Sequence, residues 1–166
     1  MDTSNKATFT FSKDKKSVEI TRHFDAPLPL VWKAWTEAAI LDKWWAPKPW
    51  KSETRKMLFA NEGQRLYCMC GPAGERSWGL ITFHDIKPQV GFAITDAFCD
   101  ESGRVNNDFP STHWEIRLEE KEGTNLVNVL TSSKEEDMKQ LIDMGFQEGY
   151  AMALDNLEEW LRGQKT

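Results

Sequence analysis

The residue best placed for chemistry is an acidic side chain within an apolar segment, Asp96. In an extended chain it shares a face with Phe92, Ile94 and Phe98, so the alternation predicts that its carboxyl group points inward. A buried carboxylate is costly unless it is paired or its pKa rises until it is neutral. Asp96 could therefore orient a ligand or act as a general acid or base. The alternative is a structural pair with an arginine or a tryptophan N–H.

His84 is a second candidate for acid–base chemistry. It shares a strand face with Trp78 and Leu80, which predicts that the imidazole ring also points inward. A histidine and a carboxylate within hydrogen-bonding distance could transfer protons, so an Asp96–His84 contact would favour an enzyme. A lone histidine that only satisfies the core or an edge of the sheet is the alternative.

Cys68 and Cys70 lie on one face of a predicted strand, where two thiolates could bind a metal ion. No second such pair and no histidine in register accompanies them, so we expect free thiols and no metal site. The sequence also has no phosphate-binding loop, dinucleotide fingerprint, nucleophile elbow or zinc-protease motif. We therefore expect no cofactor and assign no catalytic residue.

Aromatic residues are unusually frequent, with eight tryptophans among 166 residues. Large aromatic side chains can line a pocket for an apolar molecule, although at strand spacing they can also be plain core. The aromatic candidates for a pocket lining are Trp44, Trp45, Tyr67, Trp78, Phe92, Phe98 and Trp114.

Small residues recur at every fourth position of a predicted helix, at Gly145, Gly149 and Ala153. Glycine inside a helix costs about 1 kcal/mol relative to alanine, so two glycines need a reason. We expect the missing side chains to leave room for a ligand between the helix and a sheet. Close packing of the helix on the sheet is the alternative. Met152, from the same helix, completes the predicted ligand-binding set together with Asp96, His84 and the aromatic residues.

The elements that position these residues follow from the periodicity of apolar residues. Alternation predicts strands near 7–11, 17–24, 51–60, 64–70, 76–86, 90–100, 111–121 and 125–132. Helical spacing predicts short helices over 27–36 and 37–45 and one long helix over about 135–162. Connections between the later strands are too short for parallel crossovers, so these strands are antiparallel. The predicted fold is α+β, with a curved antiparallel sheet of about six or seven strands around the long C-terminal helix. We expect a single domain over 1–166, with residues 1–6 frayed.

The amino-acid composition makes some classes of binding partner less favourable. The chain has 21 basic and 26 acidic residues and a net charge of −5, which disfavours binding to nucleic acid or to an anionic membrane surface. No stretch approaches the length of a transmembrane helix. Three cysteines, an odd number, cannot form a complete disulfide framework, so we expect a cytoplasmic protein.

Several stretches of the chain resemble the START/SRPBCC superfamily, and in particular the group named after the C-terminal domain of the 90-kDa heat-shock-protein (Hsp90) ATPase activator. The matching stretches are Arg22–Pro27, Val31–Thr36, Trp44–Trp45, Gly71–Gly74, Gly145–Gln147 and Leu154–Leu161. The resemblance implies a helix-grip fold, in which a curved antiparallel sheet grips a long C-terminal helix and encloses an apolar cavity.

Three functions are compatible with these observations. The first is binding of a small apolar or aromatic molecule in a cavity between the sheet and the C-terminal helix. The second is a protein-interaction module, similar to a co-chaperone, in which an acidic helix face meets a basic partner. The third is a cofactor-free enzyme of the polyketide cyclase type, which shares this fold and would use Asp96 or His84 as acid–base groups.

Overall fold

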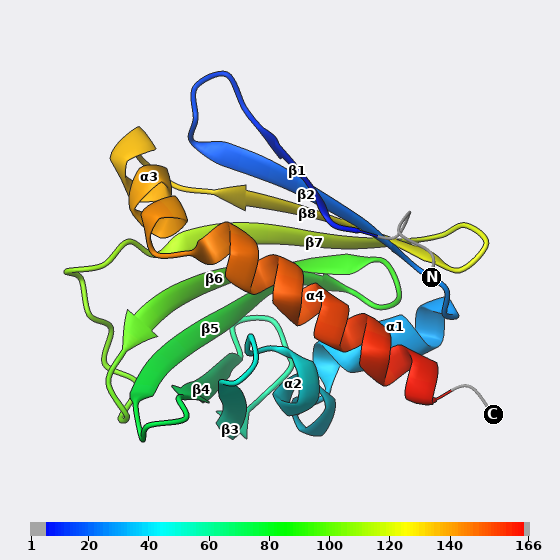
Figure 1. Cartoon of the computed structure of the whole chain (residues 1–166), viewed down its shortest axis with the longest axis horizontal. Coiled ribbons are helices and arrows are strands. Elements are labelled where there is room, and N and C mark those ends of the chain that lie inside the picture. The colour runs from blue at the N-terminus through cyan, green and yellow to red at the C-terminus, as the bar shows by residue number, and fades with distance from the viewer. Residues whose placement is uncertain (1–5, 165–166) are drawn as a thin grey trace.

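The computed structural model describes residues 6–164, and its centre is one eight-stranded antiparallel sheet (Figure 1). The strand order across the sheet is β1-β2-β8-β7-β6-β5-β4-β3. The strands are β1 (Thr8–Phe11), β2 (Ser17–Phe24), β3 (Lys51–Met57), β4 (Gln64–Cys70), β5 (Arg76–Lys87), β6 (Gly91–Cys99), β7 (Thr112–Glu120) and β8 (Thr124–Thr131). The α+β helix-grip prediction is confirmed, with a strand count slightly above the six or seven expected, because both strands of the N-terminal hairpin join the sheet.

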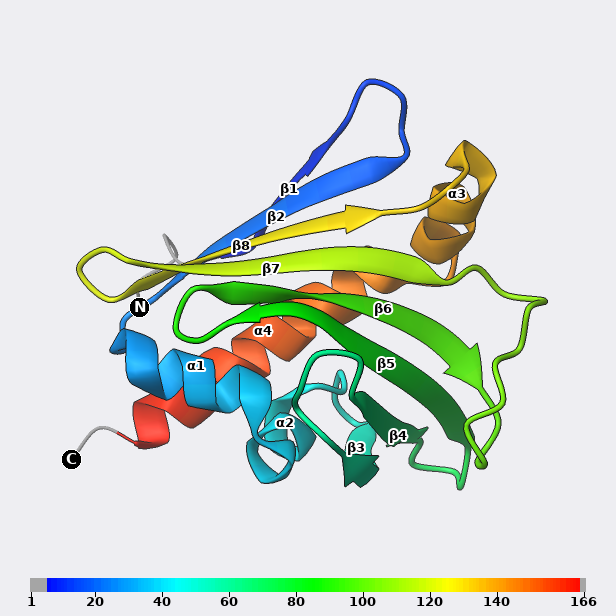
Figure 2. The same cartoon turned by 180° about the vertical axis from the view of Figure 1, so that it is seen from behind.

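The helices lie mainly on one face of this sheet. They are α1 (Leu28–Thr36), α2 (Ala38–Trp44), α3 (Glu135–Asp143) and α4 (Phe146–Gly163). Figure 1 shows α4 running obliquely across the sheet, and Figure 2 shows the strands in front of it when the molecule is turned around. None of the helices between residues 6 and 164 is both long enough and apolar enough to cross a membrane. Of the residues predicted to be frayed, 1–5 lie outside the described range.

The single long helix predicted over 135–162 is wrong. The chain instead forms α3 and α4, separated by Met144 and Gly145, and Gly145 has a φ of 88°. That left-handed conformation ends a right-handed helix, and glycine adopts it without the steric cost of a Cβ. The apolar periodicity continues across the break, so the spacing alone could not reveal it. Gly145 therefore lies in the turn between two helices rather than inside one.

The C-terminal half of α4 is fixed to the sheet by polar contacts as well as by apolar packing. The guanidinium group of Arg22, on β2, donates to Asp155 Oδ1 at 2.6 Å and to Glu158 Oε2 at 3.1 Å. Asn156 Nδ2 donates to the backbone oxygen of Ala46 at 3.0 Å, which joins α4 to the end of α2. Apolar side chains of β2, β8, α1 and α4 fill the space between these contacts. The N-terminal half of α4 packs differently, and a pocket lies beneath it.

Candidate functional site

A pocket of about 300 Å³ lies between strands β4–β7 and the N-terminal half of α4. Its walls come from the sheet, from the segment after α2 and from the turn between α3 and α4. The lining residues are Trp45, Pro47, Tyr67, Met69, Ser77, Trp78, Gly79, Asp96, Ala97, Phe98, Pro110, Thr112, Trp114, Leu130, Leu141, Met144, Gly145, Phe146, Gly149 and Tyr150. Most of these side chains are apolar, and the volume is at the lower end of the range for small-molecule sites.

The structure places most of the predicted site residues at this pocket. Those at the pocket are Trp45, Tyr67, Trp78, Asp96, Phe98, Trp114, Gly145 and Gly149. Trp78 differs from the others in the direction of its side chain. It pairs with Cys68 and Cys99 in the sheet, so its ring lies with their side chains on the outer face, away from α4. The Trp78 ring stacks there with the guanidinium groups of Arg55, at 5.0 Å, and Arg76, at 5.4 Å.

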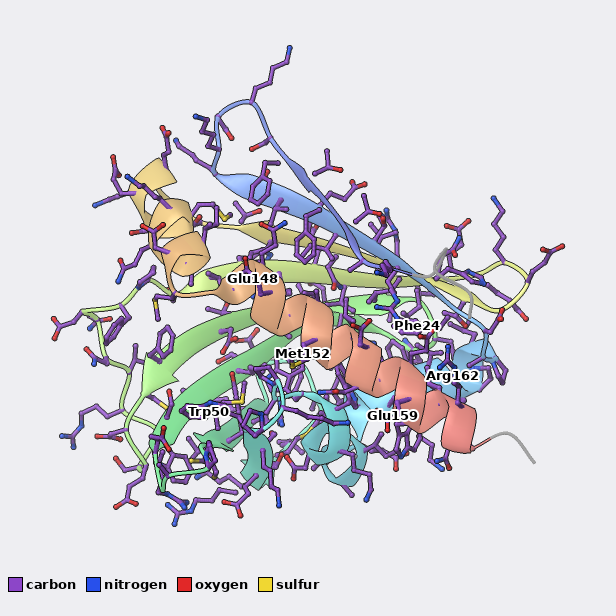
Figure 3. The ribbon with its side chains drawn as sticks, in the orientation of Figure 1. Phe24, Trp50, Glu148, Met152, Glu159 and Arg162 are labelled. Carbon is purple, nitrogen blue, oxygen red and sulfur yellow. The ribbon has the colours of Figure 1, made fainter. Side chains whose placement is uncertain are left out.

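Four of the candidate residues do not line the pocket. Phe92 packs instead against Phe59 and Phe83 in the core, and three further residues lie elsewhere. Trp44 is fully buried in the core, where its indole N–H donates to the Ala34 backbone oxygen at 3.0 Å. Met152 lies on the solvent-facing side of α4, with 42% of its surface exposed (Figure 3). Both predictions are corrected by the orientation of their helices: α2 turns Trp44 into the core beneath α1, and α4 turns Met152 outward.

His84 is the third, and the inward orientation predicted for it is wrong. Its Nε2 lies 3.0 Å from Thr95 Oγ1 and its Nδ1 lies 3.0 Å from Glu62 Oε1. Thr95 precedes Asp96 on β6, so the two side chains point to opposite faces of the sheet. The hypothesis of an Asp96–His84 acid–base pair is therefore contradicted. On β5 the buried face carries Ile81 and Phe83, so its large residues at even positions face outward.

Asp96 points into the pocket from β6, as the alternation predicts. Its Oδ1 accepts a hydrogen bond from the Tyr67 hydroxyl at 3.2 Å. Burial raises the pKa of Asp96 to about 6, although the Tyr67 hydrogen bond and the positive charge of Arg65 act in the opposite direction. The partner of Asp96 is thus a tyrosine hydroxyl rather than the arginine or tryptophan considered from the sequence.

Tyr67 is held in place by an ion pair behind it, in which Arg65 is buried and Asp42 is 28% exposed. The guanidinium carbon of Arg65 lies 4.4 Å from the centre of the Tyr67 ring, and Arg65 Nη2 donates to Asp42 Oδ1 at 3.3 Å. Ser52 and Thr54 accept further hydrogen bonds from the same guanidinium group. Burial and the neighbouring Asp96 charge raise the pKa of Tyr67, so its hydroxyl remains a donor. These contacts join α2, β3 and β4 into one support for the polar end of the pocket.

The raised pKa of Asp96 predicts how the free energy of unfolding changes with pH. Its pKa rises from an ordinary value of 3.8 to about 6 on folding, so the folded protein holds this proton more tightly than the unfolded chain. The resulting stability is present below about pH 4 and is lost as the pH rises through about 6. We expect Asp96→Asn, which stays neutral, to raise the free energy of unfolding by roughly 1–3 kcal/mol at about pH 7.5.

Urea unfolding of both proteins at about pH 4 and about pH 7.5 checks this, because the difference should vanish at the lower pH. An equal difference at the two pH values would show that Asp96 does not titrate as described. The asparagine keeps an oxygen that can accept the Tyr67 hydroxyl, so the comparison changes the charge and little else.

Other pocket residues were missed by sequence reasoning, above all Phe146 and Tyr150. They lie one turn apart on α4, and their rings are stacked with centroids 5.9 Å apart. The Tyr150 hydroxyl donates to Asn128 Oδ1 in the core, and its ring packs at 5.1 Å against Trp114. The signal available in the sequence was their helical spacing on the same side as Gly149, which places aromatic rings beside the missing side chain.

The cysteine pair on β4 is close but does not form a metal site. Cys68 and Cys70 are free, and their sulfur atoms lie 3.4 Å apart on the outer face of the sheet. Within residues 6–164, no three side chains of histidine, cysteine, aspartate or glutamate are grouped so that they could hold a metal ion.

Comparison with models of protein families shows the family of the chain. The family model described as "Activator of Hsp90 ATPase homolog 1-like protein" matches residues 25–162, which is most of the sequence. The chain belongs to this family. The resemblance inferred from the N-terminal and C-terminal motifs is thereby confirmed. No curated protein matches the sequence.

Solved structures with the same fold come from several bacteria. A protein from Arthrobacter aurescens, determined by NMR, is 28% identical with a TM-score of 0.88, and the match covers 96% of this chain and 93% of that one. Protein Ms6760 from Mycobacterium smegmatis is 26% identical with a TM-score of 0.87, covering 96% and 99% of the two chains. The fold of the Hsp90-activator-like family supports a ligand-binding or interaction module in general.

Proposed function

We propose that this member of the Hsp90-activator-like family binds a small apolar or aromatic molecule in the pocket beneath α4. The observation that carries the proposal is the open space of about 300 Å³ between the sheet and the helix, lined by aromatic rings and by one carboxyl group, that of Asp96. An apolar enclosure with few polar groups is the usual form of a small-molecule site. The apolar wall would supply affinity and Asp96 would orient the ligand.

The glycines of the pocket wall support the same conclusion. A Cβ placed on Gly149 would meet only Pro47 Cγ, at 3.7 Å, which is an ordinary van der Waals contact. A Cβ on Gly145 would meet no atom within 4 Å. Neither glycine is therefore required for close packing of the helix on the sheet. The absence of side chains at these positions leaves space, as a ligand would need.

The alternative functions receive less support from this geometry. A co-chaperone-like interaction module does not need an open pocket, and its acidic helix residues on α3 are those of an ordinary solvated face. A cyclase-type enzyme would need a second acid–base group beside Asp96, and His84 lies on the other face of the sheet. We further infer a cytoplasmic setting with no membrane or nucleic-acid partner, which free thiols at Cys68, Cys70 and Cys99 and the negative net charge favour.

Titration with methylnaphthalene, monitored by proton–nitrogen correlation spectra, tests the proposal. We expect saturable shifts of the indole N–H signals of Trp45 and Trp114, which line the pocket. The signals of Trp50 and Trp160 should stay in place, because neither residue contributes to the pocket. Shifts spread evenly over all four indoles, or confined to the latter two, would contradict binding in the pocket.

A further inference from the structure

The carboxylate of Asp96 is not fully used by the protein. An ionised carboxylate offers about four acceptor positions, and among residues 6–164 the one group that donates a hydrogen bond to Asp96 is the Tyr67 hydroxyl. No ion pair within residues 6–164 includes Asp96. Arg65 is nearby, but its guanidinium group donates to Asp42 and to two hydroxyl groups instead. A half-buried negative charge thus faces the pocket without a cationic partner in direct contact.

The aromatic rings that line the same pocket would also favour a positively charged ligand. The faces of aromatic rings attract cations, and several rings surrounding one position form the arrangement that proteins use to hold ammonium groups. Aromatic pocket residues come from the segment after α2 and from β4, β6, β7 and α4. They are Trp45, Tyr67, Phe98, Trp114, Phe146 and Tyr150. Glu148, in the first turn of α4, offsets the positive end of that helix, which would otherwise favour an anion.

The charged and titratable groups around Asp96 can be assigned element by element. Tyr67 faces it from β4 and Arg65 lies behind that ring, while Tyr150 belongs to the α4 wall. Cys99 lies three residues after Asp96 on β6, with its side chain on the outer face of the sheet. The residues of β5 and β7 at the pocket do not ionise. Burial raises the pKa values of Tyr67, Tyr150 and Cys99, so within the lining only Asp96 changes charge between about pH 5 and pH 8.

We propose that the ligand carries a basic nitrogen, which binds the Asp96 carboxylate as an ammonium group while its aromatic or apolar body fills the rest of the pocket. This inference rests on the proposed function and narrows it from apolar molecules in general to apolar amines. The nitrogen would donate to the free acceptor positions of Asp96 and lie against the aromatic faces. A carboxylate or phosphate ligand would instead place two negative charges together in a buried site.

Three probes of one shape test the inference: naphthylmethylamine, methylnaphthalene and naphthoic acid. At about pH 7.5 we expect the amine to bind at least about tenfold more tightly than methylnaphthalene, and the acid to bind more weakly than either. At about pH 5, where Asp96 is largely protonated, the advantage of the amine should shrink several-fold while methylnaphthalene is unaffected. Asp96→Asn should remove the advantage at both pH values. Calorimetric titration gives all of these dissociation constants.

The outcomes separate this inference from the function on which it rests. Binding of methylnaphthalene in the pocket without any advantage for the amine, or an advantage that survives in Asp96→Asn, overturns the inference and leaves the proposed function standing. Tighter binding of naphthoic acid overturns it in favour of an anionic ligand. Failure of all three probes to bind overturns both. Glu159→Gln, which removes a carboxylate on the exposed part of α4, is the control that should leave every affinity unchanged.

Discussion

Replacing Gly149 by leucine will abolish binding to the pocket and leave the fold intact. The new side chain starts from a position where a Cβ has only one neighbour, Pro47 Cγ at 3.7 Å, and it extends into the space that the ligand would occupy. We expect the affinity for methylnaphthalene to fall by at least about a hundredfold. Leucine is also a better helix former than glycine, so the free energy of unfolding should stay the same or rise by up to about 1 kcal/mol.

The matched control for this substitution is Gly163→Leu. Gly163 also lies on α4, and a Cβ there would meet no atom within 4 Å, but the residue is outside the pocket. Calorimetric titration and urea unfolding of the two variants and the wild type give both quantities. A loss of more than about 2 kcal/mol of stability in Gly149→Leu would show that the site is closely packed and that the space is not available to a ligand.

The second large effect is expected at the ion pair that supports Tyr67. The Arg65 side chain is 1% exposed, and Asp42 is the acidic group that balances its charge. Burial lowers the pKa of Arg65 and the charge of Asp42 opposes this, and an arginine guanidinium group stays protonated at neutral pH. Asp42→Ala therefore leaves a buried positive charge without its partner, and such a change typically costs about 3–5 kcal/mol. We expect a loss of this size in the free energy of unfolding.

An exposed ion pair provides the comparison. Lys48 and Glu159 are 61% and 71% exposed, so Glu159→Ala should change stability by no more than about 0.5 kcal/mol. The double variant Asp42→Ala/Arg65→Met should be more stable than Asp42→Ala alone, because it removes the unpaired charge. Urea unfolding measures all three variants. A cost below about 1 kcal/mol for Asp42→Ala, or no recovery in the double variant, would mean that Arg65 is balanced in some other way.

The sequence was most informative where one side of an element is plainly apolar. Asp96 alternates with Phe92, Ile94 and Phe98, all on the buried face of β6, so its inward orientation followed from strand geometry alone. The orientation of His84 on β5 was predicted wrongly because both faces of this strand carry large apolar residues. The outward-facing Trp78 is as large as the inward-facing Phe83, and a period of two cannot say which set faces the core.

The α3–α4 region shows a second limit of sequence periodicity. Helical spacing runs through Met144 and Gly145 without interruption, whereas the backbone turns at Gly145. The pocket wall formed by α4 depends on this turn, because the turn sets where Phe146 and Tyr150 lie over the sheet. The ion pair of Asp42 and Arg65 was also beyond prediction, because its residues are distant in the sequence and meet only when α2 packs beside β3 and β4.

Native mass spectrometry of the protein, after incubation with a small-molecule extract of the cells that produce it, tests the central claim most directly. We expect an additional mass of a few hundred daltons that is lost on denaturation and is absent from Gly149→Leu. The same additional mass should persist in Gly163→Leu. A bare mass for the wild type under these conditions, or an additional mass that Gly149→Leu retains, would contradict the claim that the pocket beneath α4 binds a small molecule.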